Sequence, residues 1–404
     1  MQRKYIQPTK IFFFSFLLDL IRGIFFACFV TNLVSRKIDH DTVILAYSVL
    51  QFSLSFFEPI TGFLADIKGR KKCTLSGVIL YILGLAVLAF ELNSISIFAS
   101  FILAGIGQNL FQGAKPAWLI SVTEENIDIN FSTKNMLFIL DRLRRIGLVL
   151  GAFLAELTEK PEEVWILTGV LGCLCIAIGL SINSEKRIIK SENNLCNQFL
   201  DSIFPIHKNC FFWGIIVVSA IYAIETGNRD SVTQIYVKEF LSGNQFAMTR
   251  VQFFVATSGI LGSFIYTRFL QKYSTFLLIT VSLITVSIVQ TLFAFWITNM
   301  SQFCVLISVQ CLTLGWFYPL CDSILYNSIN HKFSATALSL QNMVDSFFQG
   351  ISCWAISKFA LGKFPIETLW SIGSIATFIC AIVLNGFLFY SRAMHSSSKK
   401  LEGI

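Results

Sequence analysis

Several charged side chains lie inside apolar stretches of this 404-residue chain. The deepest is Asp345, about twelve residues, or about 18 Å along a helix, into an apolar stretch at 334–359. Gln341 and Asn342 precede it by about one turn. A carboxyl group at that depth is suited to bind and release a proton, so we assign these three residues to a substrate or proton pathway. The alternative is a buried acid that hydrogen-bonds a neighbouring helix.

A second pair of charges, Asp19 and Arg22, lies in the first apolar stretch of the chain. A charge at the centre of a bilayer costs about 2.5–3.5 kcal/mol, so it usually faces a cavity or a partner. Residues three apart share one face of a helix, so these two side chains can pair with each other. The pair is a candidate for the pathway, and the alternative is a purely structural ion pair.

The stretch GWFYPLCD, at 315–322, combines aromatic, kinking and acidic residues. Pro319 can kink a helix at this point, so that Trp316 and Tyr318 could reach a bound molecule. Asp322 follows them directly. These three side chains are therefore assigned to the same pathway as Asp345.

Two glutamates near the ends of apolar stretches are candidate gate residues. Glu58 precedes Pro59 near the inner end of the second stretch. Glu225 lies near the outer end of the seventh, close to Arg229 and Asp230. A solvated helix end is the alternative for Glu225.

Other charges within the apolar stretches are predicted to reach the membrane surface. Lys115 is close enough to the inner surface for its long side chain to reach water. Asp141, Arg142, Arg144 and Arg145 open the fifth stretch and are also predicted to lie at the surface.

The composition shows what kind of element must hold these residues. Hydrophobic residues make up 54% of the chain and charged residues only 14%, whereas soluble proteins are about 25% charged. Stretches of about 20 apolar residues recur, and each can cross a bilayer as a helix. In lipid the backbone must satisfy its own hydrogen bonds, and the short period-two segments of a membrane barrel do not occur here. We therefore predict an all-α integral membrane protein with twelve transmembrane helices, at about 11–34, 42–65, 73–92, 95–121, 138–158, 162–183, 209–227, 248–270, 275–298, 301–327, 334–359 and 366–390.

The longest polar connection divides these helices into two sets of six. The predicted domains are an N-terminal six-helix bundle at 1–183, a cytoplasmic linker at 184–208, a C-terminal six-helix bundle at 209–392 and a cytoplasmic tail at 393–404. Most Lys and Arg residues fall in connections on the same side as the N-terminus. The positive-inside rule then places both termini in the cytoplasm. The membrane is predicted to be the inner membrane of the cell.

Composition and motifs also exclude several functions. The net charge of +7 follows from the basic loops and does not indicate nucleic-acid binding. The sequence contains no G-x-S-x-G, H-E-x-x-H or G-x-x-x-x-G-K-[ST], the motifs of serine hydrolases, zinc proteases and nucleotide-binding loops. Most of the 11 cysteines lie in apolar stretches, and the four histidines lie in loops or the tail. We therefore predict that the protein is not an enzyme and holds no metal or cofactor.

The segment GFLADIKGRKK, from Gly62 to Lys72, concentrates charge between the second and third predicted helices. Gly62 lets helices approach closely, and Gly69 permits a tight reversal with positive φ. Asp66 can accept hydrogen bonds from a helix N-terminus, where negative charge is favoured. Arg70 can pair with an acid at a neighbouring helix end. These four residues are predicted to form a conformational latch, although the lysines that follow can simply set topology.

This segment resembles the loop signature G-x-L-a-D-r-x-G-r-k of the major facilitator superfamily in residue type, spacing and place. The resemblance extends over the whole chain through the helix count, the central linker and the orientation. It implies two six-helix halves that rock about a central site, and a loop that stabilises the outward-facing state. The stretch NLFQGAKPA, at 109–117, is similar to a second family pattern, R-x-x-q-G-x-x-x-A. Gln112 matches that pattern, Asn109 replaces its arginine, and both are assigned to the pathway.

The stretch GLVLGAFLAE, at 147–156, resembles the family's antiporter pattern g-x-x-x-G-P-x-x-G-G. Gly147 and Gly151 match it and form a small contact face for a neighbouring helix. Ala152 replaces the proline, and Ala155 and Glu156 replace the glycine pair. These departures weaken the case for proton antiport.

The family resemblance implies a secondary transporter that works by alternating access. The stretch ATALSLQN, at 335–342, also looks like drug-efflux relatives. The first expectation is proton-coupled export of an amphipathic drug or metabolite, such as a siderophore, by a monomer. The alternatives are a proton-coupled importer of a polar metabolite, which a charge-lined cavity would favour, and a receptor of the same fold that has lost transport.

Overall fold

The computed structural model describes most of the chain, namely residues 2–90, 93–126, 133–158, 161–182, 210–239, 247–327, 334–360 and 365–401. Every regular element within these residues is a helix: α1 (Gln2–Ser35), α2 (His40–Lys68), α3 (Arg70–Val87), α4 (Ser94–Gln112), α5 (Ala114–Asn126), α6 (Thr133–Glu156), α7 (Pro161–Ser181), α9 (Cys210–Glu239), α10 (Ala247–Ile265), η2 (Tyr266–Leu270), α11 (Thr275–Trp296), α12 (Met300–Asn327), α13 (Ser334–Ala355), η4 (Ile356–Ala360) and α14 (Ile366–Leu401).

These helices match the twelve predicted spans. The elements α4 and α5 follow one another as one rod, as do α10 with η2 and α13 with η4, so the fifteen helical elements make twelve rods. Seven of the described helices are long and apolar enough, by length and composition alone, to cross a membrane. Three rods are clearly longer than predicted, because α1 begins at Gln2, α9 continues to Glu239 and α14 continues to Leu401. The chain is therefore an all-α, multi-pass membrane protein.

Local sequence signals set several helix boundaries. The Asp39 carboxylate accepts a hydrogen bond from the Thr42 backbone N–H at 3.0 Å and caps the start of α2. Gly69 separates α2 from α3 with a φ of 104°, a conformation that a residue with a side chain adopts only with strain. Asn93 and Ser96 form a reciprocal capping box at the start of α4.

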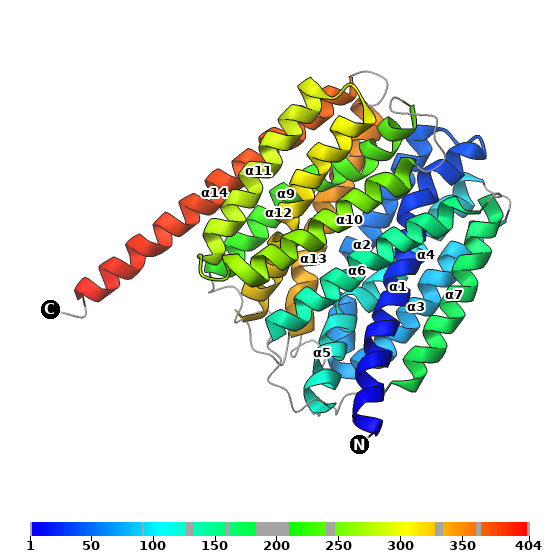
Figure 1. Ribbon diagram of the computed structural model, residues 1–404, viewed down its shortest axis with the longest axis horizontal. Helices are drawn as coiled ribbons and strands as arrows, with labels where there is room; N and C mark the ends of the chain where they lie inside the picture. Colours follow the sequence, from blue (N-terminus) through cyan, green and yellow to red (C-terminus); the bar gives the residue numbers. More distant parts are fainter. Residues whose placement is uncertain are drawn as a thin grey trace.

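The rods form two bundles of six that lie side by side (Figure 1). One large cluster of buried apolar side chains is built mainly from α1–α7, and a second is built mainly from α9–α14. The predicted linker at 184–208 lies outside the described residues, so the domain boundaries given above stay predictions.

The outer faces of the bundles are apolar, as contact with lipid requires. Large hydrophobic side chains on α7 and α11 are exposed, among them Val170, Ile288 and Phe295.

The bundles meet where α2 packs along α13 and where α6 packs against α10. Three hydrogen bonds follow the first contact: the Ser48 hydroxyl donates to the Gly350 carbonyl at 2.8 Å, the Asn342 amide to the Glu58 carboxylate at 3.0 Å, and the Ser357 hydroxyl to the Asp41 carbonyl at 3.2 Å.

Candidate functional site: a charged cavity between the two bundles

A cavity of about 510 Å³ lies between the bundles. Its lining comes from α1, α2, α4, α5 and α6 of the first bundle and from α9, α10, α12 and α13 of the second. Most of the predicted pathway residues contribute to this lining, namely Asp19, Arg22, Gln112, Tyr318, Asp322, Gln341, Asn342 and Asp345.

The first charged cluster in the cavity is centred on the buried carboxylate of Asp19. Its Oδ2 atom lies 3.0 Å from the ammonium nitrogen of Lys115, and its Oδ1 atom lies 3.4 Å from Nη1 of Arg22. The predicted pairing of Asp19 with Arg22 is confirmed. The surface position predicted for Lys115 is wrong: its side chain is only 10% exposed, because the acid 96 residues away holds the ammonium inside the bundle.

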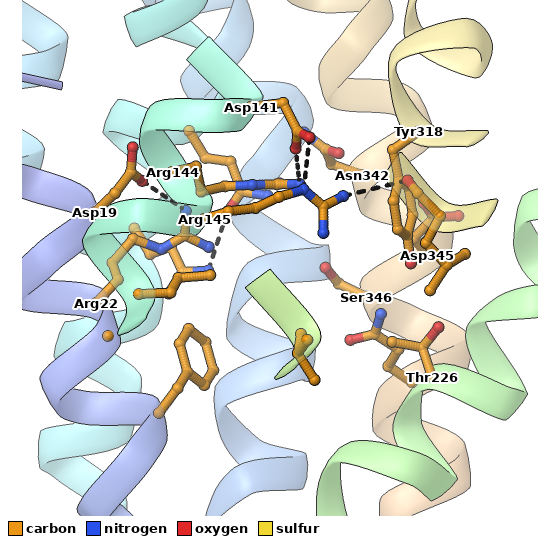
Figure 2. A pocket seen from close by; sticks show the side chains of 18 of the residues that line it. Asp19, Arg22, Asp141, Arg144, Arg145, Thr226, Tyr318, Asn342, Asp345 and Ser346 are labelled. Atoms are coloured by element: carbon orange, nitrogen blue, oxygen red, sulfur yellow. Dashed lines mark hydrogen bonds and ion pairs between the residues drawn. The ribbon is translucent and has the colours of Figure 1, made fainter. Parts of the chain in front are cut away.

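The second charged cluster is centred on Asp141 in α6. Oδ2 of Asp141 accepts a hydrogen bond from Nε of Arg145 at 2.8 Å, and Oδ1 pairs with Arg144. Arg145 also donates from Nη2 to the Leu314 carbonyl on α12 at 3.2 Å, and so links the two bundles. Figure 2 shows Arg144 and Arg145 between the Asp19 side of the pocket and the Tyr318 side.

The prediction that these α6 residues lie at the membrane surface is wrong. Asp141 and Arg145 are both buried, and Arg142 is half-buried. The Arg142 guanidinium donates to the hydroxyls of Ser263 and Thr267, at 2.9 Å and 3.1 Å, where α6 meets α10 and η2. The sequence alone could have indicated this cluster. Asp141 precedes Arg144 by three residues and Arg145 by four, and residues at these spacings can form ion pairs on one face of a helix.

Close packing of α1 against α6 brings the two clusters together. A Cβ atom at Gly151 would lie 2.3 Å from the Leu20 carbonyl oxygen, and one at Gly147 would lie 2.9 Å from the Leu20 nitrogen. The contact face predicted from these two glycines is therefore confirmed. Their lack of side chains lets the backbones of α1 and α6 touch.

The opposite side of the cavity carries acids without basic partners. Asp322 on α12 and Asp345 on α13 both line it, and neither forms an ion pair with another described residue. Oδ1 of Asp345 is buried and has no hydrogen-bond partner within the described part of the chain. The neighbouring amides point elsewhere: Gln341 donates to the Ser219 hydroxyl at 3.2 Å, and Asn342 donates to Glu58.

Two of the predicted pathway residues are not part of the cavity lining. Asn109 donates to the backbone carbonyls of Ser53 and Leu54, at 3.0 Å and 2.8 Å, and so joins α4 to α2. Trp316 is buried in the apolar core of the second bundle. Asn109 and Trp316 miss the cavity because the face of the helix that carries each of them packs against other helices. In a helix that is apolar all round, the sequence does not show which face lines a cavity.

Among the described residues predicted to form the gate and latch, none is part of the cavity lining. Glu58 is buried and bonded to Asn342 across the bundles, and Gly62 is also buried. Arg70 donates to the Ala117 carbonyl at 3.4 Å and to the Ser121 hydroxyl at 3.1 Å, and so connects the start of α3 to α5. The side chain of Asp66 is outside the described part of the chain, and its role stays a prediction.

Glu225 belongs to a buried polar group in the second bundle and not to a solvated helix end. Its Oε1 atom accepts hydrogen bonds from the amides of Gln290 and Gln310, at 2.8 Å and 3.1 Å. Its Oε2 atom lies 3.6 Å from Nη1 of Arg229, which lines the cavity. The helix α9 continues past this point to Glu239, and the carboxylate is held between α9, α11 and α12.

Comparison with known proteins agrees with this architecture. The chain is similar to the nucleoside transporter NupG, with a TM-score of 0.74 at 14% identity over 94% of this chain and 99% of that one. It is also similar to the human organic anion transporter MFSD10, with a TM-score of 0.72 at 12% identity over 94% and 99%. A POT family transporter, solved in complex with a thioalcohol-conjugated peptide, gives a TM-score of 0.74 at 11% identity over 96% of both chains. At these identities the likeness shows the fold alone.

Sequence comparison identifies the family. No curated protein matches the chain. The family model described as the Major Facilitator Superfamily matches residues 11–226, which is more than half of the sequence. Together with the two six-helix bundles and the cavity between them, this match shows that the chain belongs to the Major Facilitator Superfamily.

Proposed function

We propose that the protein is a secondary transporter that moves a small polar organic molecule through the cavity between its bundles, coupled to protons. The observation that carries this proposal is the placement of both charged clusters and both unpaired acids around one cavity. Alternating access also requires a binding site at the junction of the two bundles. When the bundles rock against each other, a site at this place can open first to one side of the membrane and then to the other.

The lining supports a polar cargo. An amphipathic drug favours apolar walls with a few polar groups. Phe26, Phe29 and Phe111 do supply apolar surface, but four aspartates and five basic residues also line the cavity. A compound without charge would leave many of these groups desolvated and uncompensated. The charged lining therefore favours a polar metabolite, which the sequence analysis gave as an alternative, and disfavours an amphipathic compound. Two of the similar structures carry polar cargo in their descriptions, a nucleoside transporter and a peptide complex.

The contacts between the bundles support movement by alternating access. The cross-bundle bonds Ser48–Gly350 and Asn342–Glu58 join neutral donors to acceptors, and such bonds are each worth only about 1 kcal/mol, or somewhat more where the acceptor is charged. Breaking a few of them at one end, while the other end closes, requires little net free energy. The same proposal places both termini in the cytoplasm and takes the protein to act as a monomer.

Asp345 is the residue that we propose for proton coupling. It lines the cavity, and its carboxylate has no basic partner in the described part of the chain. A carboxyl group that faces a cavity without a fixed counter-ion can exchange its charge with a proton or with a cargo group as the cavity changes access. Asp322, which lines the same cavity, also has no ion-pair partner among the described residues.

Reconstitution in liposomes with an imposed pH gradient tests the proposal. Labelled polar metabolites and amphipathic compounds are compared, with the gradient in both directions, so that the direction of transport is an outcome. We expect gradient-driven flux of a polar compound. Asp345→Asn should abolish its dependence on the gradient, while exchange of cargo between the two sides persists when the cargo is saturating. Asp39→Asn, which lies outside the cavity, is the matched control.

Other results would contradict parts of the proposal. Gradient-driven flux that survives unchanged in Asp345→Asn rejects that residue as the coupling group. Flux restricted to amphipathic compounds rejects a polar cargo. Specific binding without any flux identifies the receptor alternative.

A further inference from the structure

The charges around the cavity are separated onto two walls. The basic wall consists of Arg22, Lys115, Arg144 and Arg145, from α1, α5 and α6. The acidic wall consists of Asp322 and Asp345, from α12 and α13. The first wall belongs to one bundle and the second wall to the other, so a cargo between the bundles contacts both.

The basic wall has a surplus of positive charge. The buried Asp19 neutralises only one of its two basic partners, and the buried Asp141 neutralises only one of Arg144 and Arg145. Two unit charges therefore remain on this wall. They are presented by Arg144, whose side chain is 38% exposed, and by Arg22, at 15%.

The acidic wall carries two carboxyl groups without an ion pair. Asp322 and Asp345 have no ion-pair partner within the described ranges, whereas Glu225 is paired with Arg229, and Glu58 accepts a hydrogen bond from Asn342. The basic wall therefore offers positive charge to a cargo, and the acidic wall offers two carboxyl groups.

Each wall also presents an unused hydrogen-bonding atom. Nε of Arg22 is a buried donor with no acceptor among the described residues, and Oδ1 of Asp345 is a buried acceptor with no donor among them. A buried polar atom without a partner costs about 1–3 kcal/mol, so each is a place where a cargo atom is stabilising. Nε of Arg22 can donate a hydrogen bond to an anionic group of the cargo, and Oδ1 of Asp345 can accept one from a cationic group or bind a proton.

We propose that the cargo is a zwitterion with a carboxylate at one end and an ammonium at the other, in the class of amino acids and short peptides. This inference rests on the proposed transport function and names its substrate class. The cargo carboxylate lies against Arg22 and Arg144, because guanidinium groups bind carboxylates with paired, parallel hydrogen bonds. The cargo ammonium lies between Asp322 and Asp345. A cavity of about 510 Å³ is within the usual range for sites that enclose small ligands.

The test measures binding without transport, as ligand-induced thermal stabilisation of the purified full-length protein. The probes are sets matched in carbon skeleton: amino acids and dipeptides, their methyl esters as cations, the corresponding deaminated acids as anions, and neutral sugars and nucleosides. We expect the largest stabilisation from a zwitterion, with its ester and its deaminated acid binding about 10- to 100-fold more weakly.

Two variants separate the ends of the cargo. Arg144→Gln should weaken binding of the zwitterion about tenfold or more and leave binding of its ester unchanged, because the ester lacks the carboxylate. Asp322→Asn should do the reverse, weakening the zwitterion and sparing the deaminated acid. Asp322 has no ion pair among the described residues, so its variant retains the fold even if the arginine variant does not.

The outcomes distinguish this inference from the transport proposal. Strongest stabilisation by a neutral compound, a pure anion or a pure cation overturns the zwitterion, as does a panel in which no zwitterion stabilises the protein. Stabilisation by a zwitterion without flux in liposomes keeps the inference and overturns transport. Flux of a neutral compound keeps transport and overturns the inference.

Discussion

Gly151 on α6 gives the sharpest test of the packing that supports the cavity. A Cβ atom at this position would lie 2.3 Å from the Leu20 carbonyl oxygen and 2.7 Å from the Ile24 nitrogen of α1. Ordinary contact begins at 3.4 Å, so Gly151→Ala forces α1 and α6 apart by about 1 Å. Both neighbours are backbone atoms and cannot rotate away. Overpacking of this kind costs about 1–3 kcal/mol, and the separation also disturbs the clusters of Asp19 and Asp141.

Gly169 on α7 is the matched control, because a Cβ atom there would meet nothing within 4 Å. Alanine favours a helix over glycine by about 0.5–1 kcal/mol, so Gly169→Ala should be neutral or stabilising. Both variants gain the same helix propensity, so they should differ by the overpacking cost alone, about 1–3 kcal/mol. At about 2 °C for each kcal/mol in a large domain, this is a difference of about 2–6 °C in Tm, measured in detergent. Equal Tm values for Gly151→Ala, Gly169→Ala and the unsubstituted protein would refute the close contact of α1 with α6.

Three further predictions concern single contacts. The capping hydrogen bonds from the first turn of α2 lower the pKa of the Asp39 carboxyl, so the cap stabilises above the ordinary value of about 3.9 and its contribution is lost as pH falls through the lowered pKa. Asp39→Ala should cost about 1 kcal/mol at pH 7, and Asp39→Asn should keep the cap and remove its pH dependence. Melts of both variants and the unsubstituted protein at pH 7 and at a series of pH values below about 3.9 check this, and an Asn variant as weak as Ala contradicts it. Asn342→Ala removes the 3.0 Å bond to Glu58 between the bundles, so hydrogen exchange in α2 and α13 should accelerate, and unchanged exchange would show that the bond does not hold the bundles together. Asp19→Asn removes the carboxylate from buried Lys115 and should cost about 3–5 kcal/mol, with much of that loss recovered when Lys115→Met is added; a single variant as stable as the unsubstituted protein rejects the ion pair.

The sequence determined the number and nature of the helices. Runs of about 20 apolar residues in a chain with 14% charge leave helices as the workable way to satisfy the backbone in lipid, so the twelve spans followed from composition. Local geometry was also readable: the pairing of Asp19 with Arg22 and the contact face of Gly147 and Gly151 depend on residues three or four apart on one helix. The turn at Gly69 needed a positive φ, and the residue type indicated it.

Only the tertiary structure decided which charges meet. Lys115 looked free to reach water, but its partner Asp19 lies on another helix, 96 residues earlier. The arginines of α6 looked like surface anchors, because a cluster of basic residues at the start of a span usually is one. They lie inside because the small faces of α1 and α6 bring Asp141 and Asp19 to the same side of the cavity. A sequence gives the order of side chains along a helix, but the packing of the helices decides which face turns inward and which distant charge it meets.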